Sequence, residues 1–223
     1  MEDRARWISH LEFLRAFTRA LRRGRLPVAY SQGYNPHARI SFATARPVGM
    51  ASEGEYVDVL FEEELRAEAV KTVLNQVFPG NIEARECRRI PGDRPSLASA
   101  VNASRYRFDF AEGDAGGLAA ALERLLGWER VPVIRHRRGK PDRVLDIRPG
   151  ILEVGDVVAT RGGDVGFCVD LSLGGEEGVR PGELLRSLEA CPDSAEGWRG
   201  DPAIRRIDIY RREGNDRVSP WCL

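Results

Sequence analysis

The stretch that decides the fold is ARWISHLEFLRAFTRALRRG, which spans residues 5–24. Its first four residues can form a short strand, and Ser9 and Glu12 have the spacing of a capping box, which starts a helix. Apolar side chains then recur at helical intervals, at Leu11, Leu14, Phe17 and Leu21. Because Gly24 ends this pattern, the stretch predicts a strand followed by an amphipathic helix.

The rest of the first half predicts two strands, a second helix and a final strand. These elements are expected at residues 39–43, 54–61, 64–78 and 82–90. Alternating apolar side chains indicate the strands, and an apolar stripe at helical spacing indicates the helix. The resulting order, β-α-β-β-α-β, is that of the ferredoxin-like fold.

The same order recurs in the second half, after a segment rich in proline and serine. Strands are expected at residues 105–110, 131–137, 143–147, 151–160, 166–173 and 204–211, and helices at 118–126 and 181–188. We therefore expect an α+β protein of two tandem ferredoxin-like (βαββαβ) sandwiches with antiparallel sheets, the second with extra strands. The expected parts are an N-terminal domain at residues 1–91, a linker at 92–104, and a C-terminal domain with an inserted hairpin at 105–223.

Composition excludes several classes of protein. The 223 residues contain no apolar run of about 20 residues, the length that crosses a bilayer, and begin without the apolar segment of a signal peptide. We therefore expect a cytoplasmic protein with no membrane partner. The four cysteines form no C-x-x-C pair and only three histidines are present, so we expect no metal site, iron–sulfur cluster or other cofactor held by this chain alone.

The two signs of charge are equal in number, 34 of each, but they are unevenly distributed. Residues 1–50 contain nine arginines and three acidic residues, whereas residues 51–83 contain eight acidic residues and two basic ones. A segregated basic face attracts phosphate backbones. The alternative, that both signs mix on a solvated surface, stays open at this point.

Two basic stretches are candidates for binding RNA. The first leads from the predicted helix into the loop YSQGYNPH, residues 30–37, where tyrosines can stack on unpaired bases and arginines can bind phosphates. The second, RHRRGKPDR at residues 135–143, is predicted to form a hairpin with cations at its tip. The candidate nucleic-acid-binding residues are Arg15, Arg19, Arg22, Tyr30, Tyr34, Asn35, His37, Arg39, Arg135, Arg137, Arg138 and Lys140.

His10 and His37 are the candidate catalytic residues. In the expected fold the first two strands are neighbours, so the two imidazoles could approach each other and divide acid and base roles in RNA cleavage. Each histidine also has a structural interpretation, in which it hydrogen-bonds the backbone at a helix start or a turn. The sequence leaves both interpretations open.

A set of motifs runs through nearly the whole chain. The motifs are WISHLEFLRAF from residue 7, LPVAYSQGYNPH from 26, ISFA from 40, PVG from 47, SEGEY from 52, DIRP from 146 and VRPGELL from 179. This set resembles the signature of the radical-SAM-associated, or radical-SAM-linked, family of bacterial proteins in its standalone form. It departs from that signature at Ala38 and Arg39, where a second proline and a lysine are usual.

The resemblance implies a partner protein. Standalone members are encoded beside a radical SAM enzyme with a B12-binding-type front domain, and near ribonuclease G and ribosomal protein genes. A radical SAM enzyme binds its cluster through a C-x-x-x-C-x-x-C motif, which this chain lacks. If the protein takes part in radical chemistry, the separately encoded enzyme must therefore supply the cluster.

We expect a non-catalytic accessory module that binds RNA or a ribonucleoprotein and presents it to the radical SAM enzyme. One alternative is an endoribonuclease or RNA-modifying enzyme that uses His10 and His37. The other is a module that binds only proteins, through the acidic residues 62–68 or the apolar residues 219–223.

Overall fold

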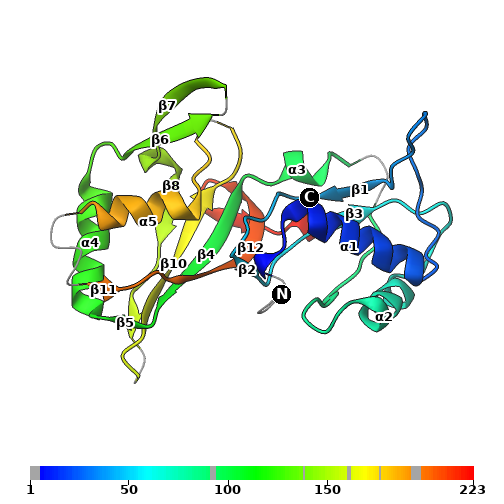
Figure 1. The fold of residues 1–223 in the computed structure, drawn as a ribbon, viewed down its shortest axis with the longest axis horizontal. Helices are drawn as coiled ribbons and strands as arrows, with labels where there is room; N and C mark the ends of the chain where they lie inside the picture. Colours follow the sequence, from blue (N-terminus) through cyan, green and yellow to red (C-terminus); the bar gives the residue numbers. More distant parts are fainter. Residues whose placement is uncertain (1–5, 91–93, 138, 160–161, 176, 192–196) are drawn as a thin grey trace. The chain divides into compact units, whose positions relative to one another are not determined.

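The computed structural model describes residues 6–90, 94–137, 139–159, 162–175, 177–191 and 197–223. The chain forms two compact units, one made of residues 1–101 with 209–223 and the other of residues 102–208 (Figure 1). Helices and antiparallel strand pairs occur in both units, so the expected α+β class is confirmed. The tandem ferredoxin-like arrangement stays a prediction. None of the described helices has the length and apolar character needed to cross a membrane.

The first unit is built around two helices and a short strand pair. Its elements are α1 (His10–Arg23), β1 (Ile40–Phe42), β2 (Ala51–Ser52), β3 (Val57–Val59), α2 (Ala67–Val77), α3 (Leu97–Ala100), β13 (Asp216–Val218) and the 3-10 turn η4 (Pro220–Cys222). Strands β1 and β3 pair antiparallel, with Ile40 opposite Val59 and Phe42 opposite Val57. The loop that follows α1 leads into β1 of this strand pair.

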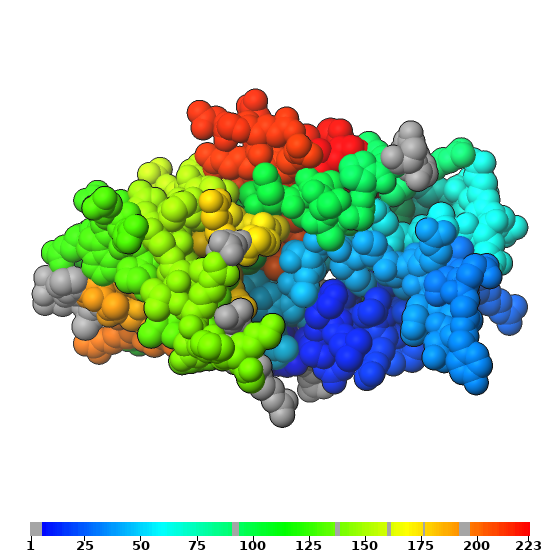
Figure 2. Space-filling view, turned by 90° about the horizontal axis from the view of Figure 1, so that it is seen from above, coloured from blue at the N-terminus to red at the C-terminus, as the bar shows by residue number. Residues whose placement is uncertain are grey.

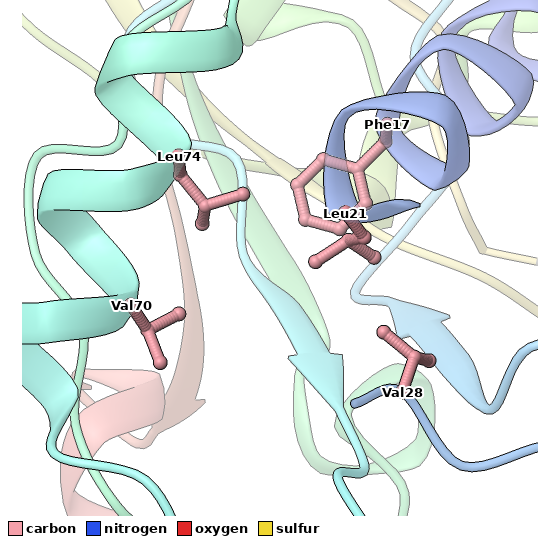
Figure 3. Close-up of a cluster of buried hydrophobic side chains, with 5 residues drawn as sticks. All are labelled: Phe17, Leu21, Val28, Val70 and Leu74. Atoms are coloured by element: carbon pink, nitrogen blue, oxygen red, sulfur yellow. The ribbon is translucent and has the colours of Figure 1, made fainter. Parts of the chain in front are cut away.

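The core of the first unit lies between α1 and α2. Its buried members are Phe17, Leu21, Val28, Val70 and Leu74. Figure 3 shows that the side chains of α2 and those of α1 point toward one another. The apolar face of each helix is thereby removed from water, which is the main source of stability in such a small unit.

The buried stripe of α1 differs from the expected one. Phe13, Phe17, Ala20 and Leu21 are buried, whereas Leu11 is 54% exposed and Leu14 is only half-buried. The reason is aromatic packing, because the rings of Phe13 and Phe17 lie 5.5 and 5.7 Å from the ring of Phe42 in β1. The helix is rotated to bring both phenylalanines onto that ring, and Leu11 turns to solvent.

Two strands expected in the first unit do not form. Residues 6 and 7 are in a 3-10 turn, residue 8 is in a bend, residue 5 lies outside the described part of the chain, and residues 82–90 are irregular throughout. The side chain of Asn75 in α2 donates to the Ala84 carbonyl at 3.0 Å and accepts from the Ala84 amide at 2.7 Å. An amide side chain thus supplies hydrogen bonds to the segment that a neighbouring strand would otherwise give.

The second unit contains a larger sheet covered by helices α4 (Ala115–Gly127) and α5 (Pro181–Glu189). Its strands are β4 (Ala103–Phe110), β5 (Glu112–Gly113), β6 (Pro132–Arg137), β7 (Lys140–Asp146), β8 (Ile151–Val154), β9 (Val158–Ala159), β10 (Val165–Ser172), β11 (Trp198–Arg199) and β12 (Ala203–Glu213), and a 3-10 turn spans Arg148–Gly150. The central order is β12-β4-β10-β8. Phe108 in β4 stacks on Phe167 in β10, and both rings are fully buried.

The boundaries between the parts of the chain differ from the expected ones. The last residues, 209–223, belong to the first unit, although the sequence placed them in the C-terminal domain. The expected linker contains α3, and β4 begins within it at Ala103. Strand β12 runs from one unit into the other, so a single strand carries the chain back.

Candidate nucleic-acid interface

The capping box predicted at the start of α1 is present. The Ser9 amide donates to Glu12 Oε2 at 2.8 Å, and the Glu12 amide donates to Ser9 Oγ at 3.2 Å. The hydrogen bond from the Ser9 amide is the main cause that lowers the pKa of Glu12, which stays ionised. The helix therefore begins at a defined residue, and the side chains along it have fixed directions.

The exposed side of α1 is strongly basic. Arg15, Arg19, Arg22 and Arg23 are exposed on the helix, and Arg25 and Arg39 are exposed after it. Among the residues that the structure describes, none of these six arginines forms an ion pair with a carboxylate. We call this set the α1 arginine face. In Figure 2 the atoms of α1 and of the segment that follows it, in blue tones, lie at the surface.

Several exposed arginines elsewhere in the chain do pair with carboxylates. Arg88 pairs with Glu86, Arg89 with Glu64, and Arg211 with Glu213. Such pairing neutralises local charge and weakens any attraction for a polyanion. On the α1 arginine face the Glu12 carboxylate lies near enough to Arg15 for Arg15 to lower its pKa, but none of the six arginines is within ion-pair distance of a carboxylate among the described residues.

Tyr30 anchors the loop that follows α1. The Arg22 Nε–H donates to Tyr30 Oη at 3.1 Å, and the Arg22 guanidinium carbon lies 5.9 Å from the centre of the ring. The Tyr30 ring is half-buried and packs against the core between α1 and α2. Tyr30 therefore holds the loop on the helix, and its ring is only partly available to a base.

The tip of the loop presents Tyr34. The Ser31 amide donates to the His37 carbonyl at 2.8 Å, and the His37 amide donates to Ser31 Oγ at 2.9 Å. These bonds close the loop at its base, and Gly33 turns the chain with a φ of +128°, which side chains rarely tolerate. Tyr34 is 100% exposed, and Asn35 beside it is exposed as well.

His10 and His37 are placed in different surroundings. The ring of His10 lies edge-on to Phe42, with the ring centres 5.2 Å apart. His37 sits at the base of the loop with an exposed side chain. Within the described part of the chain, no hydrogen bond or ring contact joins the two imidazoles. The proton transfer expected of a catalytic pair needs hydrogen-bond reach, directly or through one water.

The second basic stretch forms the hairpin β6–β7, and its first arginine is not available. Arg135 Nε donates to Glu183 Oε1 at 2.7 Å, and its Nη2 donates to Glu183 Oε2 at 2.8 Å and to the Gly178 carbonyl. The side chains are 15% and 1% exposed. Arg135 is thus a structural residue, contrary to its assignment as a phosphate ligand.

The structure describes only some of the remaining cations of the hairpin. Lys140 is exposed near the turn. Arg138 and the side chain of Arg137 lie outside the described part of the structure. His136 Nδ1 lies 2.9 Å from Asp142 Oδ2, so an acidic group is also present on the hairpin. Of the described cations of the hairpin, Arg135 is therefore the one that the structure removes from the predicted phosphate-binding set.

Two residues of this region escaped the sequence analysis as functional candidates. Trp7 is 61% exposed although it is a large aromatic residue, and Arg46 is only 3% exposed although it is charged. The only signal for either was its position relative to the motifs, because Trp7 opens the WISHLEFLRAF run and Arg46 directly precedes the PVG motif. Their exposure could not be inferred from spacing alone.

The C-terminal turn is packed within the first unit. The ring of Trp221 lies 5.6 Å from that of Tyr56, and the Arg88 guanidinium lies 4.9 Å from the Trp221 ring centre. Beside them, a pocket of about 40 Å³ also contacts Asp58 and Arg94, which is room for a few waters only. Burial is the main cause that raises the pKa of Asp58.

Metal ligands and two of the four thiols can be assessed among the described residues. Among them, no group of histidine, cysteine and acidic side chains has the arrangement of a metal site. Burial is the main cause that raises the pKa of Cys87 and of Cys191, so both thiols are weak nucleophiles.

A family profile described as "Uncharacterized protein conserved in bacteria (DUF2344)" matches residues 1–181 of the chain. A search of the curated proteins found no match.

Proposed function

Because the chain belongs to the bacterial family described as "Uncharacterized protein conserved in bacteria (DUF2344)", whose profile covers most of it, we propose a function from its surface chemistry. The protein is an accessory module that binds RNA, or the RNA of a ribonucleoprotein, through the α1 arginine face. It is not itself the catalyst. It presents the bound RNA to a separate radical SAM enzyme of the B12-binding type.

One observation carries this proposal. Six exposed arginines lie on and after α1, and none of them pairs with a carboxylate among the described residues. A cluster of guanidinium groups without carboxylate partners is the usual feature of a surface that binds phosphates. The formal net charge of the chain is zero, so any affinity for a polyanion must come from a local surface.

The partner rests on sequence motifs alone. The motifs from Trp7 to Tyr56 resemble the radical-SAM-associated family, and the chain contains no C-x-x-x-C-x-x-C motif for a cluster of its own. Co-expression with the neighbouring radical SAM enzyme, followed by affinity purification, tests this part. We expect the two proteins to be recovered together after nuclease treatment. If neither protein is recovered with the other, the proposed partner is refuted.

The RNA part is tested by measuring affinity for structured and unstructured RNA over a salt series. Affinity is expected to fall as salt rises, because binding releases condensed counterions. The double variant Arg15→Glu/Arg19→Glu should weaken binding at least about tenfold at low salt and flatten the slope by roughly 1.4. Absence of binding by the native protein at low salt would refute the proposal.

A matched control separates the local face from overall charge. Arg66→Glu/Arg85→Glu changes the net charge by the same amount and alters two exposed arginines that are not part of the α1 arginine face. We expect this control to bind RNA nearly as tightly as the native protein. Equal weakening by both double variants would contradict a specific role for the α1 arginine face.

We also propose a ferredoxin-like topology for the second unit. Its sheet order β12-β4-β10-β8, with α4 after the first of these strands in sequence and α5 before the last, supports this assignment. The first unit supports the tandem arrangement less, because only the pair β1–β3 forms a sheet between its two helices among the described residues.

A further inference from the structure

The most unusual surface residue of the first unit is Trp7. A tryptophan is among the costliest side chains to leave in water, and exposed tryptophans are enriched at binding sites. Trp7 is 61% exposed and lies two residues before the N-cap of α1. The exposed Leu11 follows in the first turn, and Val48 is exposed on the neighbouring turn.

The Arg46 side chain fixes the backbone of the segment that carries Trp7. The buried Arg46 guanidinium donates to the carbonyls of Arg6 at 3.2 Å, Ile8 at 3.0 Å and Met50 at 2.6 Å. The Gly49 amide also donates to the Arg6 carbonyl, at 2.7 Å. The carbonyls on both sides of Trp7 are therefore fixed, although the ring itself faces solvent.

The turn at residues 47–50 lies beside the ring. Gly49 has a φ of +87°, and a Cβ placed there would be 3.5 Å from the Trp7 ring, which is ordinary van der Waals contact. The Arg6 guanidinium lies 4.8 Å from the ring centre, as a cation–π contact. One part of the indole is thus supported by protein, while most of its surface stays accessible. This is a preorganised aromatic platform, which costs little entropy to use.

The platform lies in the turn that leads into α1, the helix that carries most of the α1 arginine face. Leu11, Arg15 and Arg19 follow each other at four-residue intervals on the exposed side of α1, with a rise of about 6 Å per interval. Cations at this interval suit successive phosphates of an extended single strand, whereas flat exposed rings suit unpaired bases. A duplex keeps its bases stacked inside and offers none to Trp7.

We propose that Trp7 is a base-stacking platform, so that this surface binds single-stranded RNA in preference to duplex RNA. The inference rests on the proposed RNA-binding function and specifies its substrate. An unpaired base stacks on the indole beside α1, and the following phosphates contact the arginines. The fully exposed ring of Tyr34, in the loop after the helix, is a second stacking candidate in the same unit.

The test measures the affinity of native protein, Trp7→Ala and Trp7→Phe for a 12-nucleotide single strand and for its duplex across a salt series. Trp7→Ala should weaken single-strand binding by about five- to a hundredfold. Because tryptophan is neutral, the slope against salt should stay unchanged, whereas Arg15→Glu/Arg19→Glu flattens it. Trp7→Phe should keep part of the affinity, since a ring remains.

The outcomes separate the two proposals. No binding of either RNA by the native protein overturns the proposed function itself. Binding that Trp7→Ala leaves within twofold, or a duplex bound as tightly as the single strand, overturns only the stacking platform. Loss of the radical SAM partner in Trp7→Ala with RNA affinity intact would also overturn it, because Trp7 would then bind protein.

Discussion

Individual arginines show why charge along a sequence is an incomplete guide to a binding surface. Arg46 lies in the basic first fifty residues, yet it is buried and donates to backbone carbonyls. Arg15 and Arg19 come from the same stretch and remain in solvent, with no close ion pair to a carboxylate among the described residues. Their roles differ because of burial, so only the exposed arginines can contribute to a polyanion site.

Asp58 gives a prediction at the same scale. Burial raises the pKa of Asp58, so the folded state disfavours its ionised form despite the opposing effect of Arg94. The resulting loss of stability is present at neutral pH and disappears as pH falls below the pKa of the unfolded chain. Asp58→Asn should therefore raise Tm by about 1–2 °C at pH 7 and leave it unchanged near pH 3.

The control for Asp58→Asn is Asp216→Asn, which makes the same charge change at an exposed position of the same unit. Its Tm should match that of the native protein at both pH values. Thermal unfolding followed by circular dichroism is the measurement. A lower Tm for Asp58→Asn at pH 7 would show that the carboxylate has a stabilising partner.

Among the elements, the hairpin β6–β7 is joined to α5 by a buried ion pair. Burial alone would raise the pKa of Glu183, but hydrogen bonds from the Arg135 guanidinium and the Arg180 amide outweigh it, so the pKa is lowered. The pair stabilises the fold above the unfolded pKa of Glu183, and this contribution is lost as pH falls through the folded pKa.

Arg135→Met should lower the free energy of unfolding by about 3–5 kcal/mol, because it leaves a buried carboxylate without its partner. Arg135→Met/Glu183→Met should recover most of the loss, since no buried charge remains. Urea unfolding measures both, with the exposed Lys140→Met as a control expected to change stability by less than about 0.5 kcal/mol. A loss below about 1 kcal/mol in Arg135→Met would contradict the structural role of the pair.

At the scale of the whole molecule, the chain returns to the unit in which it began. Residues 209–223 belong to the first unit, where Trp221 contacts Tyr56 and Arg88. The apolar C-terminal residues were a candidate for docking a partner, but the Trp221 ring is engaged within its own unit. This placement makes the C-terminal turn part of the fold.

Trp221→Ala should therefore destabilise only the first unit, by about 1–3 kcal/mol, through the loss of packing and of the cation–π contact. Amide hydrogen exchange should accelerate at Val57–Val59 and stay unchanged in the pair β4–β10 of the second unit. The exposed Trp7→Ala serves as the control and should leave exchange at β3 unchanged. Uniform acceleration in both units would mean that they unfold as one.

Much of the fold could be predicted from local patterns. The capping box at Ser9 and Glu12 depends on residues three apart, so it could be recognised without the folded chain. The two helices of the first unit and the α+β class followed from apolar spacing in the same way. The strand expected at 82–90 did not form, because its hydrogen bonds depend on Asn75 in a neighbouring helix.

The candidate site likewise combines features that depend on local sequence with features that depend on the folded chain. The basic character of residues 15–39 and the turn at YSQGYNPH were visible in the order of residues, because composition and turn formers are local properties. Which arginines stay in solvent, how Arg46 holds the segment of Trp7, and why Arg135 is occupied by Glu183 depend on contacts between residues about 40 to 50 positions apart. Burial is a property of the packed chain, so only the tertiary structure could assign it.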